Sequence, residues 1–192
     1  DDEVKRKLYE VSKEMLESAG YIEIGMDHFA KITDEMAIAM RSKKLHRNFM
    51  GYTTKNTSLL IGLGASAISD SWFGFAQNEK SIEAYQTKVE EGVLPIYRGH
   101  LLDEKDLIVR QYIHDLMCHF ETKLIDYPSY DEMHQSIKLE LEEMIVDELV
   151  EISEETVRVT QKGIPFVRNC CMVFDQNLTQ EHSGERLFSK TI

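Results

Sequence analysis

The sequence is short of cysteine, of positive charge and of long apolar runs. Its three cysteines are Cys118, Cys170 and Cys171, and this spacing cannot wrap thiolates around an iron–sulfur cluster. No apolar run reaches the roughly 18 residues of a membrane-spanning helix, and the first residues lack the basic start and apolar middle of a signal peptide. We therefore expect a cytoplasmic protein with reduced thiols, no membrane span and no cluster ligands of its own.

The sequence contains 34 Asp and Glu residues but only 22 Lys and Arg residues, which gives a net charge of -12. Most of the excess lies in residues 101–192, which hold 19 acidic and 9 basic side chains. Acidic surface repels phosphate backbones and anionic membranes. The composition thus argues against a nucleic-acid partner, while a hydrophobic content of 42% is enough to bury a core.

The first half of the chain alternates between helix and strand patterns. The patterns predict, in order, a helix over 4–19, a strand over 21–26, a helix over 34–44, a buried strand over 59–66 and a helix over 79–91 capped by Asn78. This rhythm is typical of parallel α/β structure. It predicts that residues 1–98 form one α/β domain.

The second half has a different character from about Gly99 onward. The patterns predict a long helix after Asp103, a helix over 131–149, a hairpin of strands 150–153 and 156–160, and a last helix that begins at a Thr160 cap. Two or three helices followed by a hairpin and a helix resemble a winged helix. We therefore predict a second, mostly helical domain over 99–192.

Several motifs follow one another in a fixed order: Gly25-Met26-Asp27-His28-Phe29-Ala30, then Leu45-His46-Arg47-Asn48-Phe49-Met50-Gly51-Tyr52-Thr53-Thr54, then residues 59–69, and finally residues 164–175. This order resembles the oxygen-independent coproporphyrinogen III oxidases, which are radical S-adenosylmethionine enzymes of heme synthesis. The resemblance covers nearly all of this chain but only the back half of such an enzyme. It implies the late strands and helices of a partial (β/α) barrel, followed by the winged-helix-like domain.

The same resemblance implies an activity and its cofactors. The intact enzyme would oxidatively decarboxylate two propionates of coproporphyrinogen III to vinyl groups, which gives protoporphyrinogen IX. It would use S-adenosylmethionine and a [4Fe-4S] cluster, whose C-x-x-x-C-x-x-C ligands would belong to the N-terminal part of the same polypeptide. We expect the 192-residue chain to be a monomer that is inactive alone.

Two sets of candidate site residues come from position and composition. Asp27 and His28 follow a predicted strand, where an Asp could orient the imidazole or transfer a proton; alternatively, Asp27 bonds local backbone while His28 packs. Arg47 belongs to a basic cluster in an otherwise acidic chain, whose other members are Arg41, Lys43, Lys44 and His46. Arg can bind a substrate carboxylate through two parallel hydrogen bonds. The alternative for that cluster is a solvated helix end.

The resemblance implies a further set of contacts. It places Phe49, Met50, Gly51 and Ile68 beside a second molecule of S-adenosylmethionine. Glycine suits such a position because its backbone can approach a flat ligand. Met50 departs from the family pattern, since some relatives have Gln there and a thioether cannot replace the hydrogen bonds of an amide.

Two other functions fit parts of the sequence. A heme-trafficking radical-SAM relative would show a His-Asn-x-x-Tyr-Trp pattern near His46, but Trp72 lies too far downstream to complete it. A stand-alone winged-helix adaptor without enzymatic activity would use residues 99–192. The acidity of that half argues against DNA, though not against a protein partner.

Overall fold

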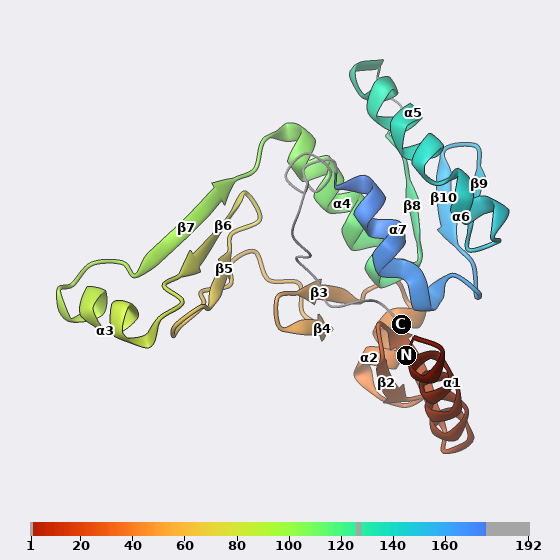
Figure 1. The fold of residues 1–192 in the computed structure, drawn as a ribbon, viewed down its shortest axis with the longest axis horizontal. Coiled ribbons are helices and arrows are strands. Elements are labelled where there is room, and N and C mark those ends of the chain that lie inside the picture. Colours follow the sequence, from red (N-terminus) through yellow and green to blue (C-terminus); the bar gives the residue numbers. More distant parts are fainter. Residues whose placement is uncertain (1, 126–127, 176–192) are drawn as a thin grey trace. The chain divides into compact units, whose positions relative to one another are not determined.

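The computed structural model describes residues 2–125 and 128–175, which fall into two compact units (Figure 1). The first unit combines the chain up to Thr54 with the chain from Val109 onward, and the second consists of residues 55–108. These limits differ from the predicted boundary near Gly99, because residues up to Thr54 pack with the C-terminal segments. The functional division into residues 1–98 and 99–192 stays a prediction.

The first unit begins with a helix and two hairpins. Its elements are α1 (Asp2–Ser18), β1 (Tyr21–Gly25), β2 (His28–Lys31), α2 (Glu35–Arg41), β3 (His46–Asn48) and β4 (Gly51–Thr53). The helix and strand predicted at the start of the chain are confirmed. Asp34 is the N-cap of α2, and its carboxylate accepts a hydrogen bond from the Met36 amide at 2.8 Å.

The prediction of parallel strands is wrong for the part of the chain that the structure describes. Every strand pair formed there is antiparallel, and no closed barrel forms. The reason is local at β1, where Met26 and Asp27 have φ angles of 44° and 64°. Two successive positive φ angles make a tight hairpin turn, so β2 returns beside β1. The fold of the chain is mixed α/β.

The C-terminal part of the first unit begins within α4 (Glu104–His119), whose residues up to Ile108 belong to the second unit. It contains β8 (Glu121–Lys123), η1 (Pro128–Tyr130), α5 (Asp131–Glu140), α6 (Glu142–Val146), β9 (Val150–Ser153), β10 (Thr156–Val159), η2 (Ile164–Phe166) and α7 (Val167–Phe174). The strands form one sheet in the order β8-β10-β9, which confirms the predicted hairpin and adds a third strand.

Two helix predictions in this part need correction, and the winged-helix assignment stays a prediction. The helix expected over 131–149 is divided into α5 and α6. Thr160 does not begin the last helix directly. Its hydroxyl donates to the Glu148 carbonyl and accepts from the Gly163 amide, so it stabilises a turn, and α7 begins at Val167.

The core of the first unit has two parts. Buried side chains beneath the two hairpins are Ile24, Ala30, Ala37, Ala39, Leu45 and Cys118. Those of the C-terminal part include Tyr112, Leu116, Leu124, Ile137, Leu141, Val150, Val157, Val167 and Phe174. Helix α4 contributes to both sets, so it joins the hairpins to the C-terminal sheet and helices.

The second unit is a small antiparallel sheet with one helix. It contains β5 (Ile68–Asp70), β6 (Gly74–Asn78), α3 (Ile82–Glu90) and β7 (Ile96–Leu101), with strand order β5-β6-β7. All of residues 55–108 are described, and only Gly74 and Asn78 among them are buried. The unit therefore has no apolar core of its own.

The strand predicted over 59–66 does not form, although Leu60 makes an isolated bridge to Asp70. Asn78 explains the difference, because its amide nitrogen donates to the carbonyls of Gly62 and Gly64 at 3.0 and 2.9 Å and holds them in a loop. Asn78 is thus not the cap of α3. The hydroxyl of Ser81 takes that role by accepting from the Ala84 amide.

No helix of the described residues is both long and apolar enough to cross a membrane.

Candidate functional site

Two hairpin turns of the first unit carry most of the predicted site residues. The first turn holds Met26 and Asp27 between β1 and β2, and Asp27 is exposed. The second turn joins β3 to β4, where the Asn48 side chain accepts a hydrogen bond from the Met50 amide at 2.9 Å. Gly51 follows this turn with a φ of +126°, a backbone angle that residues other than glycine rarely adopt.

His28 links the two turns. Its Nδ1 lies 2.8 Å from the Met26 carbonyl oxygen, and because a carbonyl can only accept, Nδ1 carries the proton. In the neutral imidazole Nε2 is then an acceptor, and it would lie 3.7 Å from a Cβ built on Gly51. The imidazole also packs edge to face against the Tyr52 ring, with 5.2 Å between the two ring centres. The structure therefore brings His28 to the predicted cofactor segment.

Phe49 and Met50 form the tip of the second turn. Both side chains are exposed, Met50 by 86%. Their exposure leaves apolar surface at the tip beside the acceptor nitrogen of His28. The tip therefore offers an aromatic ring, a thioether and a glycine to a flat or apolar ligand.

Arg47 points inward, unlike the tip residues. Its guanidinium lies 5.4 Å from the centre of the Tyr52 ring, and its Nε atom is buried without a hydrogen-bond partner among the described residues. Other members of the basic cluster are engaged elsewhere, since Arg41 donates to the Ile32 carbonyl and Lys43 pairs with Glu121. Arg47 is thus the member of this group that keeps an unused buried donor.

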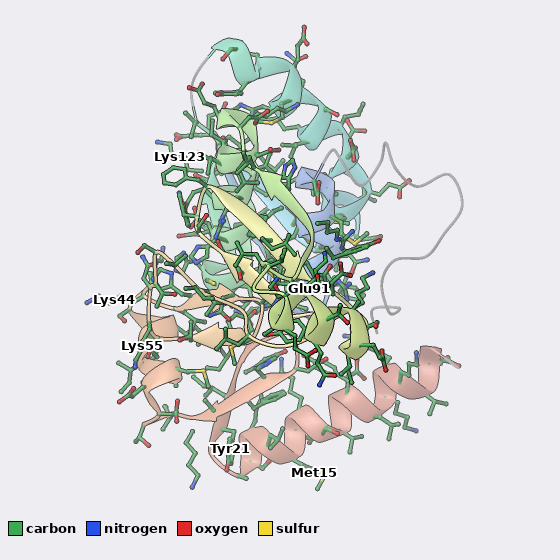
Figure 2. The ribbon with its side chains drawn as sticks, turned by 90° about the vertical axis from the view of Figure 1, so that its left-hand side faces the viewer. Met15, Tyr21, Lys44, Lys55, Glu91 and Lys123 are labelled. Carbon is green, nitrogen blue, oxygen red and sulfur yellow. The ribbon has the colours of Figure 1, made fainter. Side chains whose placement is uncertain are left out.

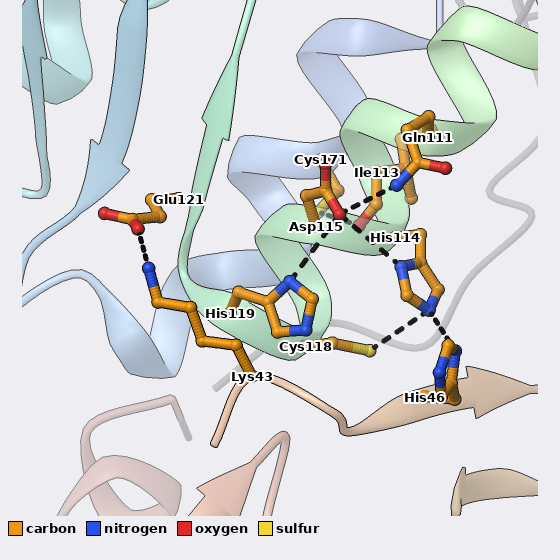
Figure 3. A network of polar contacts seen from close by, with 10 residues as sticks. All are labelled: Lys43, His46, Gln111, Ile113, His114, Asp115, Cys118, His119, Glu121 and Cys171. Atoms are coloured by element: carbon orange, nitrogen blue, oxygen red, sulfur yellow. Dashed lines mark hydrogen bonds and ion pairs between the residues drawn. The ribbon is translucent and has the colours of Figure 1, made fainter. Parts of the chain in front are cut away.

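A histidine and carboxylate network lies beside this segment (Figure 3). His46 Nδ1 lies 3.2 Å from His114 Nε2, and Asp115 Oδ1 accepts from Gln111 at 2.9 Å. The same oxygen lies 3.6 Å from Nδ1 of both His114 and His119. Burial would raise the pKa of Asp115, but the nearby imidazoles of His114 and His119 and the hydrogen bond from Gln111 outweigh burial and hold the pKa well below the usual range.

The pKa of His46 is lowered by burial and by the nearby His114 and His119. No local pattern indicates the contact between His46 and His114, because the two residues are 68 positions apart. His114 Nε2 also lies 3.8 Å from Cys118 Sγ. Across the described ranges, no three His, Cys, Asp or Glu side chains are placed to hold a metal ion.

The three cysteines are buried and unpaired by disulfide bonds. Burial raises the pKa of Cys118 to about 12 and that of Cys170 to about 11, and it also raises the pKa of Cys171. Thiols with raised pKa values are poor metal ligands because the thiolate is the ligating form. These residues act as small apolar groups of the core.

Ile68 belongs to the second unit. It begins β5, pairs with Gln77 of β6 and is half-buried. Its predicted place beside the cofactor stays a prediction. The same is true of the roles of Asp27, His28, Arg47 and the tip residues.

Comparisons with known proteins point to one group of enzymes. No protein-family model matches the chain. The oxygen-independent coproporphyrinogen III oxidase of Salmonella typhimurium is 40% identical over 186 residues, which cover 92% of this chain and 40% of the relative. The enzymes of the same name from Synechocystis and Thermostichus vulcanus are 36% and 41% identical, covering 99% and 93% of this chain and 42% and 56% of the relatives.

A solved structure agrees with the sequence comparisons. Coproporphyrinogen III oxidase from Escherichia coli, a radical SAM enzyme, matches with a TM-score of 0.80 and 36% identity over 88% of this chain and 40% of that chain. The chain thus spans about two fifths of the length of the Salmonella and E. coli proteins. Over the stretch that it spans, this chain is similar in sequence and in fold to the oxygen-independent coproporphyrinogen III oxidases.

Proposed function

We propose that this chain is the C-terminal part of an anaerobic enzyme that converts two propionates of coproporphyrinogen III to vinyl groups and so forms protoporphyrinogen IX. The observation that carries the proposal is the 36–41% identity to three enzymes of this name over nearly the whole chain. In the complete enzyme this part would shape a cofactor site and contact the substrate.

The [4Fe-4S] cluster does not fit the residues of this chain. Cys118, Cys170 and Cys171 are buried, and their raised pKa values disfavour the thiolates that iron requires. We therefore assign the cluster to the N-terminal part of the same polypeptide. This chain alone would be inactive.

S-adenosylmethionine fits the second turn better. Phe49 offers an exposed ring, and Gly51 lacks a Cβ on the side that faces His28 Nε2. Met50 can contribute apolar contact but not the hydrogen bonds of the Gln found in some relatives. When bound together with the cluster, this cofactor class supplies radical chemistry, while the protein positions the reacting groups. Ile68 is kept as a further contact on the family resemblance alone.

The substrate contact that we propose is Arg47. Its buried Nε has no partner among the described residues, and a substrate carboxylate would supply one. His28 and Asp27 complete the proposed site. His28 presents an acceptor nitrogen beside Gly51, and the exposed Asp27 contributes negative charge at the same turn.

A chimera tests the proposal. This chain would replace the matching two fifths of the E. coli enzyme, and formation of protoporphyrinogen IX would be followed by chromatography without oxygen. We expect turnover in the chimera and a loss of about tenfold or more in Arg47→Met, because a carboxylate would lose its charged partner. Arg41→Met is the matched control and should keep its activity, since Arg41 donates to a backbone carbonyl.

Two results would count against this assignment. A chimera that binds its cluster and cleaves S-adenosylmethionine but leaves coproporphyrinogen unchanged would favour the heme-trafficking alternative. Equal activity of the Arg47 and Arg41 variants would remove Arg47 from the substrate site while leaving the overall function in place.

A further inference from the structure

The hairpin that carries the second turn is attached to helix α4 by two side-chain hydrogen bonds. In the part of the chain that the structure describes, β3 and β4 pair only with each other. A two-stranded hairpin is marginally stable by itself, so its position depends on contacts with neighbouring elements. The Tyr52 hydroxyl bonds to the Met117 carbonyl oxygen, and His46 Nδ1 lies 3.2 Å from His114 Nε2. Because His114 and Met117 are three positions apart, both contacts use one face of α4.

The contact between the two histidines lies at the base of the hairpin. Lys44 is exposed and projects from the ribbon (Figure 2), whereas Leu45 is fully buried in the core. His46 follows as the first residue of β3, and the exposed tip is formed by residues 49–50. The contact with His114 is therefore placed to fix the direction in which the tip points.

The hydrogen bond between the two imidazoles requires a lone pair on one of the facing nitrogens. At 3.2 Å one nitrogen donates and the other accepts. When one ring is a cation, the other ring still offers its lone pair, and the bond becomes charge-assisted. When both rings are cations, both facing nitrogens carry protons and neither can accept. The contact thus tolerates one added proton and is broken by a second.

The nearby carboxylate compensates one proton but not two. Asp115 Oδ1 lies 3.6 Å from Nδ1 of His114 and 3.6 Å from Nδ1 of His119. One negative charge therefore serves a cluster of three imidazoles. Since the pKa of Asp115 is held low, this charge persists in mild acid.

The other ionisable groups around the pair do not add a second negative charge. They come from β3, β4, α4, α7 and the ion pair beside His119: Arg47, Tyr52, Arg110, Cys118, Cys171 and Lys43 with Glu121. The arginines are cations, and the ion pair is neutral as a whole. Burial raises the pKa of the tyrosine and of both thiols, so these groups stay uncharged. A second proton on the two histidines is therefore uncompensated.

We propose that His114 is a positioning residue for the reaction: through His46 it holds the second turn against α4, and it releases the turn when both rings are protonated. This inference rests on the proposed function, in which the second turn forms part of the cofactor site. His114 itself would touch neither cofactor nor substrate. The enzyme would lose turnover in acid because the turn moves.

A titration of the 192-residue chain tests the coupling of the two rings. Nitrogen shifts of labelled histidine would be followed from about pH 8 to about pH 4.5, and His46 and His114 should titrate in two coupled steps. His114→Gln keeps a polar side chain that cannot become a cation, so the pKa of His46 should rise toward its ordinary value of 6.5. His100→Gln, at an exposed histidine of β7, is the matched control and should leave the His46 titration unchanged. An unchanged His46 titration in His114→Gln would overturn the inference.

Hydrogen exchange shows whether the turn is released. The hairpin amides, residues 46–53, should lose about fivefold or more of their protection as the second proton binds, while the amides of β1 and β2 keep theirs. In His114→Gln the hairpin protection should stay within about twofold across the same pH range, because only one ring can be charged. His114→Leu should show low hairpin protection at every pH, and if it does not fold, the Gln variant decides. Hairpin protection that is independent of pH in the unmutated chain, or an equal loss in His114→Gln, would contradict the release.

The pH profile of the chimera connects the contact with the reaction. The pH at which turnover falls to half should be lower by about half a unit or more in His114→Gln than in the unmutated chimera, and unchanged in His100→Gln. A purely structural role would lower turnover at every pH and leave this midpoint in place. An unmoved midpoint in an active His114→Gln chimera would therefore overturn the inference. An inactive chimera would refute the proposed function alone, since the exchange experiment decides separately whether His114 holds the turn.

Discussion

The hydroxyl of Tyr52 donates a hydrogen bond to the Met117 carbonyl oxygen at 3.0 Å. Met117 lies in the last turn of α4, where carbonyls have no partner within the helix. The same tyrosine ring contacts His28 and lies beneath the Arg47 guanidinium. Tyr52 therefore connects both turns of the candidate site to the helix on which the C-terminal part is built.

Removing the Tyr52 hydroxyl should destabilise the first unit. We expect Tyr52→Phe to lower the free energy of unfolding by about 0.5–1.5 kcal/mol, since the Met117 carbonyl loses its donor. Urea unfolding measures the change. Tyr97→Phe, at an exposed tyrosine, should leave the unfolding free energy within about 0.5 kcal/mol of the starting value. Equal effects of both changes would contradict the role given to Tyr52.

Gly25, at the end of β1, lies so close to the Tyr52 hydroxyl that a larger residue would not fit. A Cβ at Gly25 would lie 2.5 Å from the Tyr52 oxygen, and Gly25 has a φ of +143°. We expect Gly25→Ala to lower the unfolding free energy by about 1–3 kcal/mol through overpacking and backbone strain. Gly20→Ala is the control, because Gly20 has a φ of +84° with open space around it. Its smaller cost would isolate the contribution of the contact.

The protonation of His28 is directly measurable. Because Nδ1 donates to the Met26 carbonyl, neutral His28 should be the Nδ1-protonated tautomer, with Nε2 as acceptor. Nitrogen chemical shifts of labelled histidine distinguish the two tautomers. A spectrum in which His28 is protonated at Nε2 would remove the acceptor that the candidate site places beside Gly51.

The lowered pKa of the half-buried His46 predicts a loss of stability in mild acid. Its folded pKa is lowered, so the unfolded chain binds this proton more readily than the folded chain. The stability that neutral His46 contributes is present above its unfolded pKa of about 6.5 and is lost as pH falls from there through the folded pKa. His46→Asn should make unfolding free energy less dependent on pH in that range. An unchanged pH slope would contradict the burial of His46 against His114.

The family resemblance makes Ile68 a test of the cofactor site. In the chimera, Ile68→Asp should abolish turnover and leave the visible absorption of the cluster intact, because a desolvated carboxylate would face the ligand. Ile68→Val should keep substantial activity, since losing one methyl group costs only about 0.5–1.5 kcal/mol even at a fully buried position. Normal turnover in a folded Asp variant would separate Ile68 from the site.

Local hydrophobic patterns predicted many of the helices and strands correctly, but they did not predict which residues each one contacts. The spacing of Leu8, Val11 and Met15 indicated α1, but it could not reveal that the opposite, polar face makes the contacts. The run over 59–66 is apolar enough for a buried strand, yet a single long-range amide, that of Asn78, holds it as a loop. Burial depends on partners that a local pattern does not specify.

The candidate site follows the same rule. Asp27, His28, Arg47 and residues 49–51 are predicted site residues whose roles stay predictions, and the structure places His28 close to Gly51. The contact between His46 and His114 joins positions 68 apart and has no sequence signature. The antiparallel return of β2 depends on positive φ angles at Met26 and Asp27, and methionine is not typical of such turns.

We propose that this chain serves the decarboxylation of coproporphyrinogen III as the C-terminal part of the enzyme. The most direct measurement is carbon dioxide release from substrate labelled in its propionate carboxyl groups, using the chimera under strict exclusion of oxygen. We predict two molecules of carbon dioxide for each coproporphyrinogen consumed, with protoporphyrinogen IX as product. Cleavage of S-adenosylmethionine without release of labelled carbon dioxide, by a chimera that contains its cluster, would contradict the claim.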